Sequence, residues 1–264
     1  FIDEAAQAIE AACWIAISRA DRVILAGDHC QLPPTIKCIE AARGGLGRTL
    51  LEKVVLHKPE TVSLLKIQYR MHEDIMRFPS RWFYHDELEA APEVKYRGIL
   101  DFDTPASWID TSELDLQEKA VAEGTGRLNT GEAELLVREL KNYMERIGIR
   151  RILEEHIDFG VISPYRAQVH YLRHLLKKEP FFRPCRRLIT VHTVDGFQGQ
   201  ERDVIMISLV RANEKGQIGF LRDLRRMNVA ITRARMKLLI LGEAVTLTRH
   251  PFYRELYEYI GGLR

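Results

Sequence analysis

The chain has 264 residues, 46% of them hydrophobic and 29% charged, which suits one or two domains with a sizeable core and excludes a disordered or collagen-like protein. Its 39 basic and 37 acidic residues give a net charge of +2, so any nucleic-acid partner has to be bound by local basic patches. The four cysteines form no Cys-x-x-Cys pair and the apolar runs fall far short of roughly 18 residues, which argues against a disulfide scaffold, a zinc ribbon and a membrane span.

Short apolar runs, each followed by a turn and a longer segment with helical spacing, recur along the chain. This pattern is typical of βα units and predicts an α/β fold with a mainly parallel sheet flanked by helices. The expected strands cover residues 23–26, 159–163, 188–191, 204–209 and 238–241. Residues 130–147 are expected to form an amphipathic helix, with Asn129 or Thr130 as its N-cap and Gly148 at its end. A second helix is expected at 165–176.

The first four residues, Phe-Ile-Asp-Glu, are expected to end a buried strand that presents two adjacent carboxylates, Asp3 and Glu4. Such a pair can hold Mg²⁺ and polarise a water molecule beside a nucleotide phosphate. An Asp-Glu pair is also common in solvated turns and at helix N-termini, so this dipeptide alone does not identify a site.

The expected strand at 23–26 runs into the sequence Gly-Asp-His-Cys-Gln-Leu-Pro-Pro at 27–34. Gly27 permits a sharp turn, and Asp28 and Gln31 supply a carboxylate and an amide at the carboxyl end of the strand. Open α/β sheets bind their ligands at this edge, so the segment is a candidate binding loop.

Five segments in order along the chain carry a family resemblance. They are Asp-Glu-Ala-Ala-Gln at 3–7, the loop at 27–34, Gln-Tyr-Arg-Met-His at 68–72, Thr-Val-Asp-Gly-Phe-Gln-Gly-Gln-Glu at 193–201, and Arg-Met-Asn-Val-Ala-Ile-Thr-Arg-Ala-Arg at 226–235. They resemble motifs II to VI of superfamily 1 helicases, in particular the group of the nonsense-mediated-decay RNA helicase and the immunoglobulin mu-binding helicase. The resemblance implies an ATP-dependent helicase of the P-loop, RecA-like fold that moves in the 5′-to-3′ direction.

The resemblance also implies roles in ATP hydrolysis. It assigns Asp3 to Mg²⁺, Glu4 to activation of the attacking water, and Gln31 to the γ-phosphate. Arg70 and Arg233 would reach the developing phosphate charge from the second RecA-like domain. Phosphoryl transfer depends on positioning and charge stabilisation, so two guanidinium groups that arrive only on domain closure can act as arginine fingers.

Further residues would hold the nucleotide, by the same resemblance. Tyr69 would stack on the adenine and Glu201 would accept hydrogen bonds from the ribose hydroxyls. From the sequence alone, Tyr69 could equally be a packed core tyrosine. Gly196 and Gly199 would allow close approach of the backbone to a phosphate.

The expected nucleic-acid track lies at strand ends. Ser163 and Pro164 end a strand before a helix, where a hydroxyl, backbone amides and the helix dipole can meet a phosphate. His192 and Thr193 are similarly placed, and Pro33 joins this set. The partner would be single-stranded DNA or RNA, which these residues do not distinguish. Six arginines could add a basic surface, although charge runs are usually solvated faces: Arg183, Arg186, Arg187, Arg222, Arg225 and Arg226.

No Gly-Lys-Ser or Gly-Lys-Thr occurs in the sequence, so the P-loop that ATP chemistry requires is absent. We therefore expect a fragment in which residues 1–65 form the C-terminal part of RecA-like domain 1. Residues 66–264 would form RecA-like domain 2, with a surface insertion at about 92–127 where periodicity is weak. Such a fragment would work with the rest of its parent chain and show little or no ATPase activity alone.

Two other functions stay open: a nucleic-acid clamp that binds without unwinding, and a P-loop enzyme that shares only the fold, such as a small-molecule kinase. Nothing in the sequence implies an oligomer or a membrane partner, so a monomer is expected. No signal peptide is visible, which suggests a cytoplasmic protein, or a nuclear one in a eukaryote.

Overall fold

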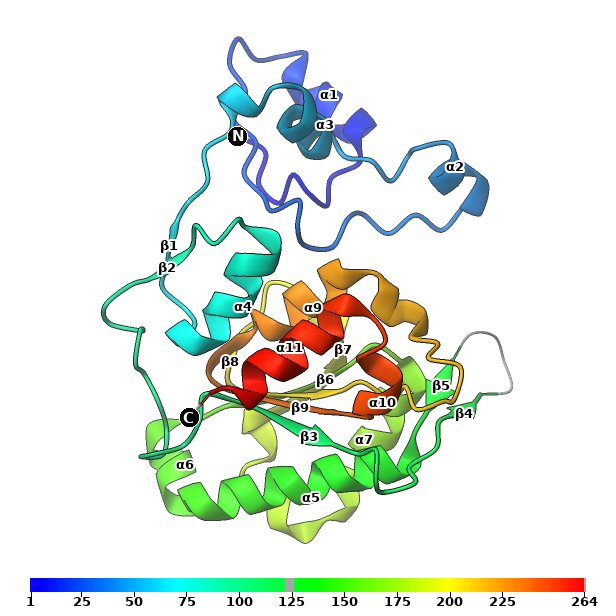
Figure 1. Cartoon of the computed structure of the whole chain (residues 1–264). Helices are drawn as coiled ribbons and strands as arrows, with labels where there is room; N and C mark the ends of the chain where they lie inside the picture. The colour runs from blue at the N-terminus through cyan, green and yellow to red at the C-terminus, as the bar shows by residue number, and fades with distance from the viewer. Residues whose placement is uncertain (122–125, 264) are drawn as a thin grey trace. The chain divides into compact units, whose positions relative to one another are not determined.

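The computed structural model describes residues 1–121 and 126–263 (Figure 1). The chain divides into two compact units, Phe1–Leu65 and Lys66–Arg264, and each is described by itself. Among the described residues, no helix combines the length and apolarity that a membrane crossing requires.

The first unit is small, and its regular elements are helices joined by long irregular segments. Its helices are α1 (Glu10–Ile17), α2 (Ile39–Arg43), α3 (Leu50–His57) and the 3₁₀ turn η1 (Pro59–Thr61). Thr49 starts α3 with a capping box, in which its hydroxyl accepts from the Glu52 amide and the Glu52 carboxylate accepts from the Thr49 amide. Leu51 on this helix packs against Ala5 and Ala6, and these three buried residues form the core of the unit.

The strand expected at 23–26 is reduced to one parallel bridge between Ile2 and Leu25. Two backbone hydrogen bonds of 2.9 Å hold that bridge, and the chain then leaves the extended conformation at Glu4, whose φ is +51°. The expectation of a buried strand at residues 1–4 is also wrong, because Phe1 is 95% exposed. An apolar run becomes a buried strand only when neighbours pair with it and cover both faces, and here one residue pairs.

The second unit is built on a five-stranded parallel sheet with the order β3-β9-β8-β6-β7. This confirms the predicted α/β fold with a mainly parallel sheet flanked by helices. The strand predicted at 159–163 is β6, and the runs at 188–191, 204–209 and 238–241 fall on β7, β8 and β9. The five strands are β3 (Ala106–Asp110), β6 (Phe159–Ser163), β7 (Ile189–Thr193), β8 (Arg202–Ser208) and β9 (Ala234–Gly242).

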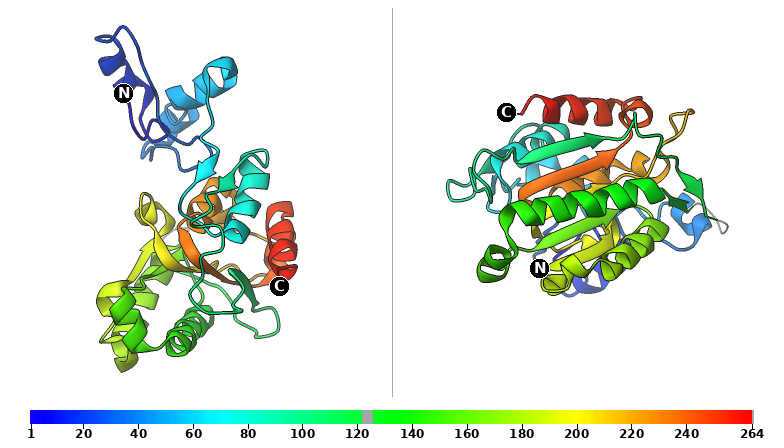
Figure 2. Two further views of the ribbon diagram at one scale, coloured as in Figure 1. Left: turned by 90° about the vertical axis from the view of Figure 1, so that its left-hand side faces the viewer. Right: turned by 90° about the horizontal axis from the view of Figure 1, so that it is seen from below.

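Helices cover both faces of this sheet, as Figures 1 and 2 show for α5 and α11. The α5 helix spans Thr130–Ile147 as predicted; Asn129 caps it by accepting a 3.0 Å hydrogen bond from the Glu132 amide, and Gly148 ends it. The remaining helices are α4 (Glu73–Phe83), α6 (Ile149–Glu155), α7 (Arg166–Lys178), α8 (Val194–Phe197), α9 (Leu224–Ile231), α10 (Ala244–Leu247) and α11 (Pro251–Gly261). Three 3₁₀ turns are η2 (Pro180–Phe182), η3 (Arg186–Leu188) and η4 (Gly219–Arg222).

One part of the segment expected as a surface insertion is a strand of the sheet. β3 pairs with β9 over five residues, and the Trp108 indole donates to the Gly242 carbonyl at 3.1 Å. The insertion at about 92–127 is therefore wrong for residues 106–110. The sequence missed this strand because an edge strand has one neighbour and mixes polar with apolar residues. Short ladders pair β1 (Ile67–Gln68) with β2 (Glu89–Ala90) and β4 (Lys119–Ala120) with β5 (Arg127–Leu128); residues 122–125 lie outside the described residues.

A buried carboxyl ties α5 to the carboxyl end of β8. Glu132 is fully buried and accepts from the Ser208 hydroxyl and, at 2.8 Å, from the Val210 amide. Burial raises the pKa of this carboxyl to about 7, against the hydrogen bonds that favour its ionised form. Val210 has a φ of +70°, which is unusual for a β-branched residue, so the bond from its amide to Glu132 helps to hold a strained turn.

Candidate functional site

In the first unit, the two candidate carboxylates lie in a turn that faces solvent. The Glu4 amide donates to Asp3 Oδ1 at 2.9 Å, and the Glu4 carboxylate accepts from the side-chain amide of Gln7 at 2.7 Å. Both Asp3 and Glu4 are exposed. Mg²⁺ is typically held by one or two carboxylates, waters and phosphate oxygens, so an exposed Asp3 fits such a site.

The loop that contains Gln31 packs against this turn within the same unit. A Cβ on Gly27 would lie 2.9 Å from the Ala6 nitrogen and 3.0 Å from the Ala5 nitrogen, so only glycine allows this close approach. Asp28 shapes the loop because its two carboxylate oxygens accept from the Cys30 amide at 2.9 Å and from the Gln31 side-chain amide at 2.7 Å. The structure thus brings Gly27, at the start of the loop that carries Gln31, to the segment that follows the two carboxylates.

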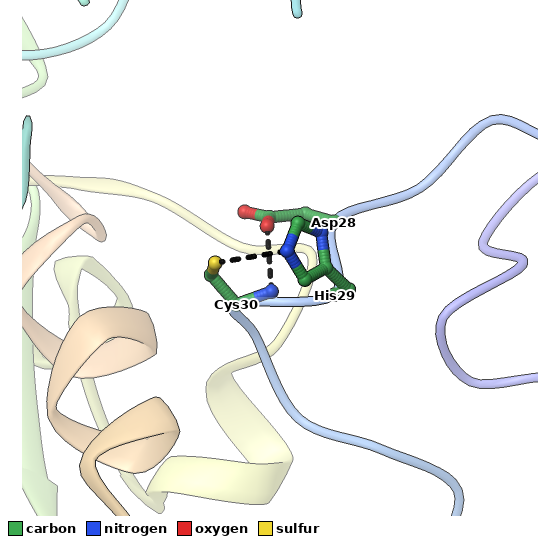
Figure 3. A group of neighbouring side chains, drawn as sticks. All are labelled: Asp28, His29 and Cys30. Carbon is green, nitrogen blue, oxygen red and sulfur yellow. Dashed lines mark hydrogen bonds between the residues drawn. The ribbon is translucent and has the colours of Figure 1, made fainter. Parts of the chain in front are cut away.

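Asp28, His29 and Cys30 lie together in this loop, with donor atoms within 4.8 Å of one another (Figure 3). The Cys30 sulfur is 3.6 Å from Nε2 of His29. The three residues are consecutive, and their only carboxylate, that of Asp28, already accepts two hydrogen bonds. Such an arrangement is typical of a turn rather than of a metal centre. Half-buried Pro33 follows in the Pro-Pro pair.

In the second unit, Gln68 organises the loop that presents Tyr69 and Arg70. Its side-chain oxygen accepts from the Arg70 amide at 2.9 Å and from the Met71 amide at 2.7 Å. The Arg70 guanidinium donates to the Glu201 carboxylate through Nε and to the Thr232 carbonyl at 3.1 Å. Tyr69 is 65% exposed, so its alternative interpretation as a core tyrosine is wrong.

Glu201 lies between two arginines. It pairs with Arg70, and its other oxygen is 3.6 Å from the Arg235 guanidinium. Burial of Glu201 acts to raise its pKa, but the hydrogen bond from Arg70 and the charges of Arg70, Arg235 and Arg233 outweigh this effect and hold the pKa below its ordinary value. The structure therefore joins residues from three of the five motifs in one charged cluster.

Arg233 belongs to this cluster but is only 2% exposed. Its guanidinium donates to the Val229 carbonyl at 3.0 Å, the Gln200 carbonyl at 3.3 Å and the Thr232 hydroxyl at 3.0 Å. In this conformation the side chain is a buried strut between β8 and α9, so contact with a phosphate requires it to exchange some of these partners.

The candidate nucleic-acid residues of this unit meet at the carboxyl ends of β6 and β7. The parallel register pairs Ser163 with Thr193, and His192 precedes Thr193 on the same strand. Nδ1 of His192 accepts from the Thr193 amide at 3.0 Å. Ser163 is buried, whereas Pro164, His192 and Thr193 are half-buried.

The two groups lie at opposite ends of the sheet. Glu201 and Arg233 directly precede β8 and β9, at the amino ends of these strands, whereas Ser163 and Thr193 end β6 and β7. Because all the strands are parallel, residues 193–201 run from one group to the other through α8. Residues 193–201 therefore connect the two groups directly along the chain.

Gly196 in this linking segment is required by a close approach. A Cβ there would lie 1.7 Å from Nδ1 of His192, a steric overlap that the His192 ring must move to relieve. We expect Gly196→Ala to lower the free energy of unfolding by about 1–3 kcal/mol, because the His192 ring must move. Urea denaturation measures this. Gly98→Ala is the control, since nothing lies within 4 Å of its Cβ; equal stability of the two variants would contradict the prediction.

Sequence reasoning missed some residues that build the arginine cluster. Arg235 joins Asp158 at 2.9 Å and Asp203 at 2.9 Å, and thereby links the amino ends of β6, β8 and β9. Arg235 stands at the end of the motif at 226–235, which could have marked it. Asp158 lies outside every motif, and no pattern along the chain could have paired it with Arg235.

Comparison with known families matches nearly the whole chain. A family model described as an AAA domain matches residues 46–245, and a second model with the same description matches residues 1–38.

Three curated relatives illustrate the similarity. The DNA-binding protein SMUBP-2 of Rattus norvegicus is 37% identical over 269 residues, which cover 98% of this chain and 26% of that protein. The DNA polymerase alpha-associated DNA helicase A of Saccharomyces cerevisiae is 38% identical over 94% of this chain and 38% of its own length. The Regulator of nonsense transcripts 1 homolog of Drosophila melanogaster is 35% identical over 98% of this chain and 22% of its own. The chain spans about a quarter of the length of SMUBP-2.

Proposed function

The chain belongs to the AAA-domain superfamily 1 helicases, and on this premise we propose that it is the C-terminal part of an ATP-dependent helicase or translocase on single-stranded DNA or RNA. The observation that carries the proposal is the meeting of Arg70, Glu201 and Arg233, which come from three separate motifs, in one cluster of the second unit. A structural ion pair does not need three motifs, whereas a site for a phosphate and a ribose uses two cations and a carboxylate.

In this proposal, the first unit supplies the hydrolytic groups. Asp3 would hold Mg²⁺, which neutralises charge on the phosphate oxygens when it is bound with ATP. Glu4 would accept a proton from the attacking water, and its exposed carboxylate leaves room for that water. Gln31 would contact the γ-phosphate, with its amide oriented by the bond that it donates to Asp28.

The second unit would supply further contacts to the nucleotide. Tyr69 would stack on the adenine, and its exposed ring is free of core packing. Glu201 would bind the ribose, which requires its carboxylate to exchange the pair with Arg70 for the hydroxyls. That exchange would release Arg70 toward the phosphate, while Gly199, with φ of +76°, would let the backbone approach it.

Single-stranded nucleic acid would bind at the other end of the sheet, at Ser163, Pro164, His192 and Thr193, with Pro33 contributed by the first unit. Contacts to the backbone would dominate, so binding would depend strongly on salt and tolerate any sequence. Residues 193–201 connect the two ends and would couple ATP binding to strand binding.

We further propose that residues 1–65 are the C-terminal part of RecA-like domain 1 and residues 66–264 are RecA-like domain 2. The sequence has no Gly-Lys-Ser or Gly-Lys-Thr for the nucleotide phosphates, so the isolated chain should show little or no ATPase activity. A clamp that binds without unwinding is the alternative; the presence of Glu4, Arg70 and Arg233 favours the motor, because a clamp has no use for hydrolytic groups.

The test is the ATPase rate of the full-length protein that contains this chain, with and without single-stranded DNA and RNA, at low and moderate salt. We expect strong stimulation by at least one polymer, and this polymer identifies the substrate. A high ATPase rate that neither single-stranded DNA nor RNA changes would overturn the helicase assignment in favour of a small-molecule enzyme. Strand binding without hydrolysis would instead support the clamp.

A further inference from the structure

The segment from residue 163 to residue 194 concentrates positive charge. It contains seven Arg and Lys residues and one acidic residue, Glu179, in a chain whose net charge is only +2. We name one group of exposed residues in this segment the α7 basic surface: Arg166, His170, Arg173, Lys177, Arg183, Arg186 and Arg187.

Four of these residues form a stripe on one helix face. Arg166, His170, Arg173 and Lys177 follow one another at intervals of four, three and four residues along α7, so they lie on the same side. The stripe is about 16 Å long at 1.5 Å per residue. It starts directly after Pro164 and Tyr165, at the carboxyl end of β6.

The cations of this surface are not neutralised within the protein. Across residues 1–121 and 126–263, no ion pair involves Arg166, Arg173, Lys177 or Arg186, in contrast to Arg150, which pairs with Glu154 at 2.8 Å on the preceding helix α6. Arg173 and Lys177 lie four residues apart on α7, where like charges repel, and a bound anion would relieve this repulsion.

A groove of about 420 Å³ lies between α7, η3 and β7. Arg173, Lys177 and Arg186 contribute its charged side chains, and Phe182 and Ile189 are among its apolar ones. His192 also lines the groove, so the groove is continuous with the candidate nucleic-acid residues at the end of β7.

One backbone carbonyl of the sheet edge beneath this groove is already occupied. The Arg173 guanidinium donates two hydrogen bonds, of 3.1 and 2.6 Å, to the Val191 carbonyl on edge strand β7. A peptide that paired with β7 would compete for this carbonyl. An anionic chain that needs cations and an apolar surface, but no backbone pairing, fits the groove better.

We propose that the α7 basic surface is an accessory site for a single nucleic-acid strand, which continues from His192 and Thr193 along α7. Phosphates would contact the basic side chains and a base would rest on the apolar part of the groove. This inference rests on the proposed function, because it extends the track that begins at the carboxyl ends of β6 and β7.

The test uses the full-length protein with Lys177→Gln and Arg186→Gln combined. Fluorescence anisotropy measures affinity for labelled single strands of about 5 and about 20 nucleotides, which bracket typical site sizes, over a salt titration. For the long strand we expect the slope of log K against log salt to fall in magnitude by about 1.4, since each lost contact removes about 0.7. The short strand should bind as it does to the wild type. Arg150→Gln with Arg151→Gln, which removes the same charge from α6, is the control.

An unchanged slope for the long strand would overturn the inference, and so would an equal fall of the slope in the control. Labelled polyglutamate serves as a second probe: a double variant that loses affinity for polyglutamate but not for the long strand would also overturn the inference. If the wild type binds neither strand, the proposed function itself fails. If the double variant binds both strands with the affinity of the wild type, only the accessory site is overturned, and the proposed function still holds. Circular dichroism melting checks that the double variant is folded.

Discussion

Glu4→Gln is expected to lower the ATPase rate of the full-length protein by roughly 10²–10⁴-fold, the usual contribution of a positioned general base, while ATP and single strands still bind. An amide does not accept the proton of the attacking water. The substitution keeps the fold because the Gln oxygen can accept the 2.7 Å hydrogen bond that Gln7 donates to the carboxylate. Glu4 is exposed, so no buried partner is lost.

Steady-state hydrolysis, with single strand at saturation, measures this effect, and anisotropy confirms strand binding. The matched control is Glu40→Gln, an exposed glutamate on α2 of the same unit, which should hydrolyse ATP like the wild type. Full activity of Glu4→Gln would contradict the assignment of Glu4 as the general base. If unwinding persisted in this variant, the motor model would need a different hydrolytic residue.

Arg70→Lys is expected to reduce kcat by about 10³-fold, at the lower end of what an arginine finger contributes. Lysine keeps the charge but loses the planar fork that now reaches both Glu201 and the Thr232 carbonyl. The change in the free energy of unfolding should stay within about 1 kcal/mol, since the pair with Glu201 is partly exposed and such pairs contribute little.

Single-turnover hydrolysis separates this chemical effect from nucleotide affinity. Arg77→Lys is the control, because Arg77 pairs with Glu73 at 3.3 Å on α4 of the same unit and has no proposed contact with the nucleotide. A large loss of stability with unchanged kcat would show that Arg70 is only a structural ion-pair partner. Equal kcat losses in both variants would show that any arginine in this unit has the same effect.

The sequence by itself determined the local elements and the family. The helix at Thr130–Ile147 was predictable because its apolar residues repeat with the helical period and because a cap and a glycine bound it, all within residues 129–148. Buried parallel strands such as Phe159–Ser163 are continuous apolar runs, which the chain also displays locally. The five motifs identified the family because their order and residue types can be read from the sequence without knowing any distance in the structure.

Only the tertiary structure decided which of these pieces meet. Residues 23–26 have the composition of a strand but pair at a single residue, whereas Ala106–Asp110, with weaker periodicity, joins the sheet edge. Arg70 and Glu201 are 131 positions apart, and their contact depends on the meeting of the loop that follows β1 with the loop that precedes β8. The physical reason is that periodicity records the burial of one segment, while pairing depends on backbone hydrogen bonds and charges supplied by distant segments.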